Sequence, residues 1–344
     1  MDETITNEIQ QDLLLPGADF LEATPESQGL DPKKLAKAVK QIKKISGRDG
    51  VDQCLVLRHG YLVWHGPDID NFHHIWSGTK AFLGLILGLL VDDGKCTLDS
   101  RAADFCPDLR QYYPEVTIRQ FANFTSGYVQ TEHSSFLPDK PLHAPGACFY
   151  YSWASDEFAN VLTRVAGEPL RDLFKRRIAD PIGMRPDRWS WGDWGEVNGL
   201  VVCGGSGWMN KGVWITAREM ARLATLLLNR GRWNDRQIIP ESWVREMFTN
   251  QVPRDLPIYQ PDKWYYRLPG AYGLGWWINT PTHTGQPNWP AAPADTFASQ
   301  ANRNNFCFII PPWNMIIVRQ GTDIRVNTDL FDTFLALFRD AIVG

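Results

Sequence analysis

Ser77 and Lys80 are the residues whose types and spacing indicate chemistry, since they stand three positions apart at the start of a strongly apolar run. Residues three apart share one face of a helix, so the amine can reach the hydroxyl. At a helix N-terminus, free N–H groups and the helix dipole favour a developing alkoxide and oppose an ammonium, and burial lowers the lysine pKa as well. A neutral lysine can accept the serine proton, so the pair predicts a nucleophilic serine.

The simplest alternative is a serine that caps the helix beside an exposed lysine, because S-x-x-K arises by chance in most chains of this length. That alternative does not explain why Lys80 opens one of the most apolar helices of the chain. A Ser-His-Asp hydrolase would carry G-x-S-x-G, and the best approach to it, Gly204-Gly205-Ser206-Gly207, fails at the final glycine.

The helix that carries the pair is predicted from about Ser77 to Asp93, with Gly94 where a helix C-terminus favours a left-handed residue. Its apolar run, residues 81–91, is about half of the roughly 20 residues that a membrane span needs, and two acidic residues follow it. We therefore expect a buried central helix.

Strand signals lie toward both ends of the chain. QCLVLRHG and YLVWHG read as a hairpin, and the runs YGLGWWI, TFASQ, NFCFIIP and MIIVRQG follow a mainly helical middle. Amphipathic helices are expected after Asp31-Pro32 and at residues 329–343. These patterns predict an α+β fold, with an antiparallel sheet built from both termini and flanked by helices, and an inserted mainly helical lobe. The expected boundaries are 1–94 and 231–344 for the sheet lobe and 95–230 for the helical lobe.

Composition argues against several classes of function. The 35 Lys and Arg residues against 39 Asp and Glu leave a net charge of -4 with no dense basic run, so no nucleic-acid partner is expected. We find no targeting segment, and the six cysteines are scattered without C-x-x-C, which predicts reduced thiols in a cytoplasmic protein with no membrane partner. The histidines lack H-E-x-x-H and carboxylates at ligand spacing, so no metal or other cofactor is expected. Oligomeric state is left open.

The stretch IWSGTKAFLGLILGLLVDDGKCTLDSRAADFCPDL, followed by VTIRQFANFTSGY, resembles the beta-lactamase-related family of serine hydrolases. That family includes class C beta-lactamases, D-Ala-D-Ala carboxypeptidases, esterases and 6-aminohexanoate-dimer hydrolases. Further similar segments are PGACFYYSWASDEFANVLTRVAGEPL, ITAREMARLATLLLNRGRWNDRQIIPESWV and FASQANRNNFCFIIPPWNMIIVRQG. The resemblance runs in order from about Pro25 to the C-terminus, and it implies a beta-lactamase/transpeptidase-like fold with Ser77 and Lys80 as catalytic residues.

The second motif of the family, Y-x-N or Y-x-S, matches Tyr151-Ser152-Trp153. The resemblance implies that Tyr151 is catalytic, since a phenol near a lysine can have its pKa lowered and pass a proton to the leaving group. Tyr150 is the adjacent alternative. Trp153 departs from the family, because an indole cannot accept a hydrogen bond from a substrate amide. This departure disfavours antibiotic hydrolysis, and we assign Trp153 to substrate binding.

The third motif, K-T-G or H-x-G on the strand that lines the site, is also altered. The match by register is Ser299-Gln300-Ala301, which has no basic residue to anchor a substrate carboxylate. His283-Thr284-Gly285 spells H-x-G but lies in a proline-rich loop. We favour the first and expect Gln300, Ala301 and Asn302 to bind substrate, with an oxyanion hole from the backbone N–H of Ser77 and one near Ala301 or Asn302.

Fifteen tryptophans are unusual for this length, and several are expected to line an aromatic cleft above Ser77. The candidates are Trp189, Trp191, Trp194, Trp208, Trp214 and Trp264.

The predicted reaction is hydrolysis of a small ester or amide through an acyl-enzyme on Ser77, with Lys80 and Tyr151 transferring the protons. The altered motifs leave two alternatives open. One is a non-catalytic relative that binds a ligand or partner in the old cleft, and the other is a true beta-lactamase or D-Ala-D-Ala peptidase.

Overall fold

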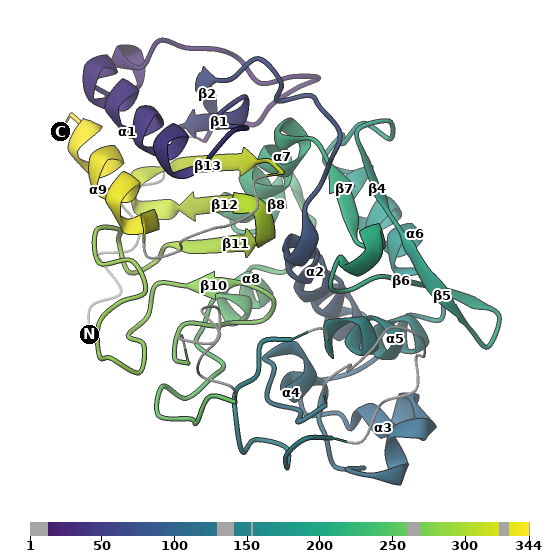
Figure 1. Cartoon of the computed structure of the whole chain (residues 1–344). Coiled ribbons are helices and arrows are strands. Elements are labelled where there is room, and N and C mark those ends of the chain that lie inside the picture. The colour runs from purple at the N-terminus through teal and green to yellow at the C-terminus, as the bar shows by residue number, and fades with distance from the viewer. Residues whose placement is uncertain (1–12, 129–140, 153, 260–268, 323–329, 344) are drawn as a thin grey trace.

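The computed structural model describes residues 13–128, 141–152, 154–259, 269–322 and 330–343. Its centre is a six-stranded antiparallel sheet in the order β10-β11-β12-β13-β1-β2 (Figure 1). The strands are β1 (Gln53–Arg58), β2 (Tyr61–His65), β10 (Trp277–Ile278), β11 (Phe297–Ala301), β12 (Asn305–Ile310) and β13 (Met315–Gln320). β1 pairs with β13 from Gln53 opposite Gln320 to Arg58 opposite Met315, so one sheet is assembled from both ends of the chain, as predicted.

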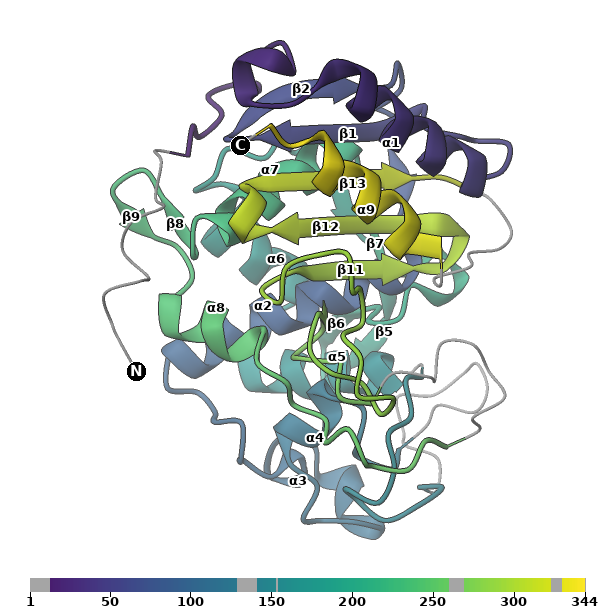
Figure 2. The same cartoon turned by 90° about the vertical axis from the view of Figure 1, so that its left-hand side faces the viewer.

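Helices cover both faces of this sheet. α1 (Pro32–Ile45) and α9 (Phe331–Ala341) lie side by side on one face, as Figures 1 and 2 show from two directions. Asp31 caps α1 by accepting hydrogen bonds from the backbone N–H groups of Lys33 and Lys34. On the opposite face, α7 (Ala217–Leu228) packs against β1, β12 and β13. The amphipathic helices expected near both ends of the chain are confirmed.

The central helix α2 (Thr79–Asp92) is buried from Thr79 to Leu90. Its start differs from the prediction, because residues Trp76–Gly78 form a 3-10 turn (η2) and the α-helix begins only at Thr79. Gly94 follows the helix with a φ of 67°, which is the left-handed ending that was expected. The chain therefore presents Ser77 on a tight turn at the buried entrance of α2.

The middle of the chain is mainly helical. Its helices α3 (Ala102–Phe105), α4 (Ile118–Ala122) and α5 (Ala154–Ala166) lie below the sheet in Figure 1, and α6 (Leu170–Phe174) lies to the right of it. A three-stranded sheet in the order β3-β7-β4 joins β3 (His73–His74), β7 (Val213–Ile215) and β4 (Trp189–Trp191), while β5 (Asp193–Val197) pairs with β6 (Leu200–Cys203). The lobe boundaries at 94 and 230 stay a prediction, and α7 lies on the main sheet although it precedes residue 231.

The run YGLGWWI is a strand only at Trp277–Ile278, so the longer strand expected there is wrong. Two glycines explain the difference, since they let this backbone bend against neighbouring backbone. A Cβ on Gly273 would lie 2.1 Å from the carbonyl oxygen of Met247, which ends α8 (Glu241–Met247), and one on Gly275 would lie 2.5 Å from that of Lys80. Gly275 also has a φ of 84°. The hairpin β8 (Arg232–Trp233) and β9 (Arg236–Gln237) precedes α8.

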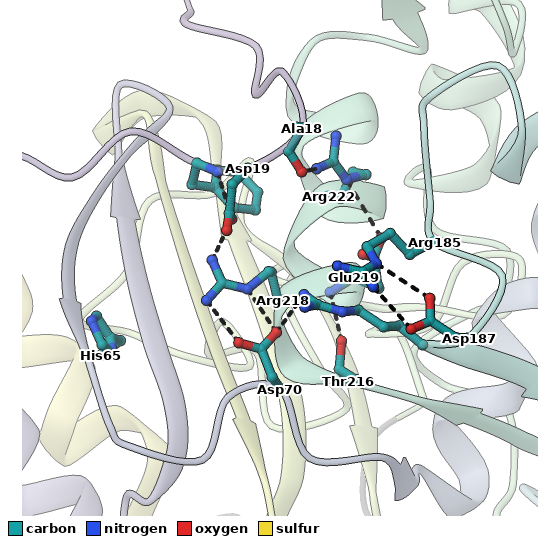
Figure 3. Close-up of polar contacts among 12 residues, drawn as sticks. Ala18, Asp19, His65, Asp70, Arg185, Asp187, Thr216, Arg218, Glu219 and Arg222 are labelled. Carbon is teal, nitrogen blue, oxygen red and sulfur yellow. Dashed lines mark hydrogen bonds and ion pairs between the residues drawn. The ribbon is translucent and has the colours of Figure 1, made fainter.

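An N-terminal strap, residues 13–22, crosses from the sheet to α7. Arg222 of α7 is 1% exposed and donates to the carbonyl oxygens of Gly17 and Ala18, each at 3.0 Å. Its Nε lies 3.4 Å from the carboxylate of buried Glu219. Arg218 binds both Asp19 of the strap and Asp70, as Figure 3 shows. Two arginines on successive turns of α7 thus hold the strap in place.

Among these described residues, no helix is both long and apolar enough to cross a bilayer. The six cysteines are free thiols, and all but Cys148 are buried.

Candidate active site

The nucleophile candidate and its proposed base are in direct contact. Lys80 Nζ lies 3.0 Å from Ser77 Oγ, within hydrogen-bonding distance. Ser77 belongs to the 3-10 turn that precedes α2, and Lys80 lies in the first turn of the helix. Between them, the buried Thr79 hydroxyl accepts the backbone N–H of Val213 at 2.9 Å, so β7 anchors the start of the helix. This arrangement holds the hydroxyl and the amine together.

The environment of Lys80 disfavours a charged amine. Its side chain is 3% exposed, and burial lowers its pKa to about 7, although the negative charge of Asp156 acts in the opposite direction. The amine lies 4.7 Å from the centre of the Tyr151 ring and 5.9 Å from that of Phe124. A lysine with this pKa is partly neutral at physiological pH, so it can accept a proton from Ser77.

Asp156 is a buried carboxylate that the sequence analysis did not single out. It is 1% exposed, and its oxygens accept hydrogen bonds from the backbone N–H groups of Gly205 at 2.7 Å and Ser206 at 2.8 Å. The Ser206 hydroxyl donates to the second oxygen at 2.5 Å. Burial raises the pKa of Asp156, while these bonds and Lys80 lower it. An acidic residue in the first turn of a helix is common, so the sequence offered no signal that distinguished this one.

Tyr151 lies just before α5, in a cluster of aromatic rings. It is 8% exposed, and its ring centre lies 4.9 Å from that of Phe124, 5.1 Å from Trp277 and 5.7 Å from Tyr272. Tyr150 instead packs edge-on against Tyr259, with 5.0 Å between ring centres. The structure thus brings Tyr151 against the amine of Lys80 and directs Tyr150 to a different neighbour. Trp153 lies outside the described residues.

Tyr272 is a second phenol in this cluster that the sequence analysis missed. Its hydroxyl is buried and has no hydrogen-bond partner among the described residues. Burial raises the pKa of Tyr272 well above its usual value, and Tyr151 adds to the effect. This phenol therefore stays protonated, which makes it a hydrogen-bond donor beside Tyr151. Its only sequence signal was its place in the run AYGLGWW.

The altered third motif lies on β11, which packs against the turn that carries Ser77. A Cβ built on Gly78 would lie 3.2 Å from Ser299 Oγ, and Ser299 and Ala301 are both buried. Gln300 is partly exposed, and Asn302 follows the strand in a short turn (η7). His283, Thr284 and Gly285 instead form a turn in the loop between β10 and β11. Of the two candidate motifs, it is Ser299-Gln300-Ala301 that occupies the strand beside Ser77.

Two backbone donors are free at the meeting of these elements. Neither the N–H of Ser77 nor that of Asn302 donates to an acceptor within the described part of the chain. Ser77 lies on η2 and Asn302 directly follows β11, the strand that contacts η2. Free N–H groups beside a nucleophile are what an oxyanion hole requires, since they can receive the charge that develops on an attacked carbonyl oxygen.

The family model of beta-lactamases matches residues 37–311. The chain belongs to the beta-lactamase family. Esterase EstB from Burkholderia gladioli is 25% identical over 175 aligned residues, and the match covers 38% of this chain and 45% of the esterase. This beta-lactamase-family chain therefore spans less than half of the length of that curated relative.

Solved structures of other proteins share the beta-lactamase fold. EstCE1, a hydrolase with promiscuous acyltransferase activity, is 17% identical, and the alignment covers 91% of this chain and 99% of that one with a TM-score of 0.66. A penicillin-binding protein homologue from Caulobacter crescentus is 18% identical, with 90% and 97% covered and a TM-score of 0.62. The predicted beta-lactamase/transpeptidase-like fold is thereby confirmed.

The prediction that tryptophans line an aromatic cleft above Ser77 is wrong for at least two of them. Trp189 and Trp191 are buried against Phe174, and Trp191 donates to the carbonyl oxygen of Gly204. They belong to the main hydrophobic core of this beta-lactamase-family chain, because alternate residues of the short strand β4 point into it. Trp264 lies outside the described residues.

The histidines just before the nucleophile lie on β3 and are buried. His73 Nδ1 hydrogen bonds to the carbonyl oxygen of His74, and burial lowers the pKa of His74 to about 4. In the part of the chain that the structure describes, no three His, Cys, Asp or Glu side chains gather as a metal site would require. The absence of a metal or other cofactor stays a prediction.

Proposed function

We propose that this protein is a serine hydrolase that cleaves a small ester or amide through an acyl-enzyme on Ser77. The observation that carries the proposal is the 3.0 Å contact between Ser77 Oγ and Lys80 Nζ, with the lysine buried and its pKa about 7. Membership of the beta-lactamase family and the match to an esterase support the same class of chemistry.

In the first step neutral Lys80 accepts the proton of Ser77 while the serine oxygen attacks the substrate carbonyl. The negative charge on the carbonyl oxygen is received by the backbone N–H groups of Ser77 and Asn302. The ammonium of Lys80 then returns the serine proton through Tyr151, whose ring lies against the amine, to the leaving group as its bond to the carbonyl carbon breaks. Water then attacks the acyl-enzyme with the same groups acting in reverse.

The substrate that fits this site best is an ester or amide with an uncharged acyl group. β11 carries Ser299 where the family has a basic residue, so the strand offers no cation to a substrate carboxylate. We assign contacts with the substrate to Gln300, Ala301 and Asn302 along this strand and its turn, and to Trp153. Small molecules of this kind, rather than nucleic acid or membrane, are the proposed partners of a cytoplasmic enzyme.

Burst release of p-nitrophenol from a p-nitrophenyl ester tests the proposal. Native protein should release about one equivalent rapidly before steady turnover, because an activated ester acylates Ser77 faster than water clears the acyl-enzyme. Ser77→Ala should lose the burst and roughly 10³-fold or more of turnover, as for other enzymes that lose their nucleophile. Ser27→Ala, which changes an exposed serine near the chain start, is the matched control and should behave as native protein.

Equal slow release from native protein and Ser77→Ala would exclude the hydrolase and favour a ligand-binding relative. Faster turnover of a chromogenic cephalosporin than of the ester would favour a true beta-lactamase. The ester is the expected substrate, because Ser299 and Trp153 replace the polar groups with which the family holds peptide-like substrates.

A further inference from the structure

Trp76 and Arg303, neighbours in sequence of the two proposed oxyanion-hole donors, lie against each other. The guanidinium carbon of Arg303 lies 5.0 Å from the centre of the Trp76 ring, a stacking distance for a cation on an aromatic face. Trp76 directly precedes Ser77, and Arg303 directly follows Asn302, so each side chain is one residue from a free N–H donor. The stack therefore links the two elements that carry the donors, η2 and the turn after β11.

Both residues have an unusual backbone conformation. φ is 50° at Trp76 and 63° at Arg303, in the left-handed region that bulky residues rarely adopt. Such conformations persist only where the surroundings hold them. The Ser77 N–H belongs to the peptide that directly follows left-handed Trp76, and left-handed Arg303 turns the chain directly after Asn302. Whatever holds Trp76 and Arg303 therefore also holds the backbone beside the two donors.

The turn of residues 302–304 is held from the sheet side. The side-chain amide of Asn305 donates from Nδ2 to the backbone carbonyl oxygen of Asn302 at 2.7 Å. Arg319, which is fully buried on β13, donates to the carbonyl oxygens of Arg303 at 2.9 Å and Asn304 at 3.0 Å. These bonds fix the turn to the sheet, but none of them reaches η2.

The turn that carries Ser77 is held from the other side. Trp76 packs on His74, with 4.7 Å between ring centres, and a Cβ on Gly207 would lie 2.5 Å from the Trp76 carbonyl oxygen. Across the gap between η2 and the turn, Arg303 reaches Trp76 and also donates from Nη1 to the carbonyl oxygen of Thr322 at 2.8 Å. No described carboxylate forms an ion pair with Arg303. The described contacts of its guanidinium are therefore with the Trp76 ring and the Thr322 carbonyl oxygen.

We propose that the Trp76–Arg303 stack is a brace that sets the spacing between the two oxyanion-hole donors. Both are positioning residues, since they act through Ser77 and Asn302 rather than on the substrate. The inference rests on the proposed function, because the donors matter only if a carbonyl is attacked at Ser77. The proposed brace explains why the left-handed position 303 carries a large cationic side chain, although a smaller residue would suffice to turn the chain there.

Paired ester and thionoester substrates test the brace, because the sulfur anion of a thionoester is larger, accepts weaker hydrogen bonds and gains less from the hole. Removing one oxyanion donor outright costs roughly 10²–10³ in kcat, so a displaced donor should cost less, about tenfold. We expect Arg303→Gln to lower kcat for the oxygen ester about tenfold with KM nearly unchanged. The thionoester rate should change little, so the preference for the oxygen ester should fall.

A double-mutant cycle with Trp76→Leu shows whether the two side chains act together. Leucine removes the aromatic ring without giving position 76 the backbone freedom of glycine. If the two side chains act together, the double variant should be no slower than the slower of the two single variants. Arg245→Ala, an exposed arginine of α8, is the control and should keep native rates and native substrate preference. Thermal unfolding of each variant reports whether it is folded.

The brace is overturned if Arg303→Gln leaves the oxygen-ester rate unchanged, or if it slows both substrates equally. It is also overturned if the two single effects add. A native protein with no turnover of either substrate would overturn the proposed function itself, and Ser77→Ala beside it distinguishes that result from a failure of the brace.

Discussion

Lys80 sets the pH range in which Ser77 can be activated, because only a neutral amine accepts a proton. Its pKa of about 7 predicts that kcat/KM rises with pH through a midpoint near 7. The negative charge of Asp156 favours the ammonium form, so Asp156→Asn should lower the pKa of Lys80 and move this midpoint to lower pH. A pH–rate profile of both proteins measures the shift.

Ser206→Ala is the matched control for that experiment, because it removes one hydrogen bond to Asp156 and keeps the carboxylate. Its midpoint should move less than that of Asp156→Asn. Coincident profiles for native protein and Asp156→Asn would contradict an electrostatic role and leave Asp156 as a structural acceptor for Gly205 and Ser206.

Sequence reasoning identified side chains of the proposed site that belong to one local pattern. Ser77 and Lys80 are separated by a single helical turn, so their contact followed from spacing alone. Asp156 and Tyr272 could not be found in this way, because the electrostatic effect of Asp156 on Lys80 and the ring contact of Tyr272 with Tyr151 depend on how distant elements pack. Arg303 escaped notice for a related reason, since its position became meaningful only once Trp76 lay beside it.

At the scale of elements, α2 depends on glycines that let other backbone approach it. A Cβ on Gly84 would lie 2.2 Å from the carbonyl oxygen of Leu274, which cannot move as a flexible side chain could. We expect Gly84→Ala to lower the free energy of unfolding by about 1–3 kcal/mol through overpacking, despite the higher helix propensity of alanine. Urea denaturation measures the change.

Gly17→Ala is the control for this prediction, because no described atom lies within 4 Å of an added Cβ there. Its stability should stay within about 0.5 kcal/mol of native protein. A Gly84→Ala protein as stable as native would mean that α2 and the Leu274 backbone can separate without cost.

Hydrophobic periodicity was enough to predict most elements of the sheet and the helices that flank it. The hairpin of β1 and β2, the strands from β11 to β13 and the helix α1 with its Asp31 cap all lie where local pattern placed them. The pattern failed at YGLGWWI, where apolar residues alternate but Gly273 and Gly275 bend the chain into contact with other backbone. Such contacts are set by tertiary packing, which no local window contains.

At the scale of the whole molecule, Arg222 connects the strap to the core through a buried charge. Arg222→Met should destabilise the protein by roughly 3–5 kcal/mol, since it leaves Glu219 buried without its partner. The double variant Arg222→Met with Glu219→Met should recover part of that loss. Arg185→Met, which breaks an exposed ion pair with Asp187, is the control and should leave the stability close to that of native protein.

Chemical denaturation of these variants measures each difference. Equal stability of the single Arg222 variant and the double variant would show that Glu219 is not the reason for the loss, and that the bonds from Arg222 to Gly17 and Ala18 dominate.

The course of the strap past β2 has a consequence for the protein in concentrated solution. β2 is the last strand of the sheet, and its outer side would present unpaired peptide groups to any other chain. The end of the strap occupies that side, since the Leu62 N–H donates to the Leu21 carbonyl oxygen, and Ala23, directly after the strap, donates its N–H to the Leu62 carbonyl oxygen. The segment thus shields the edge strand at Leu62 from pairing with another chain, and a protein whose strap detached should aggregate more readily.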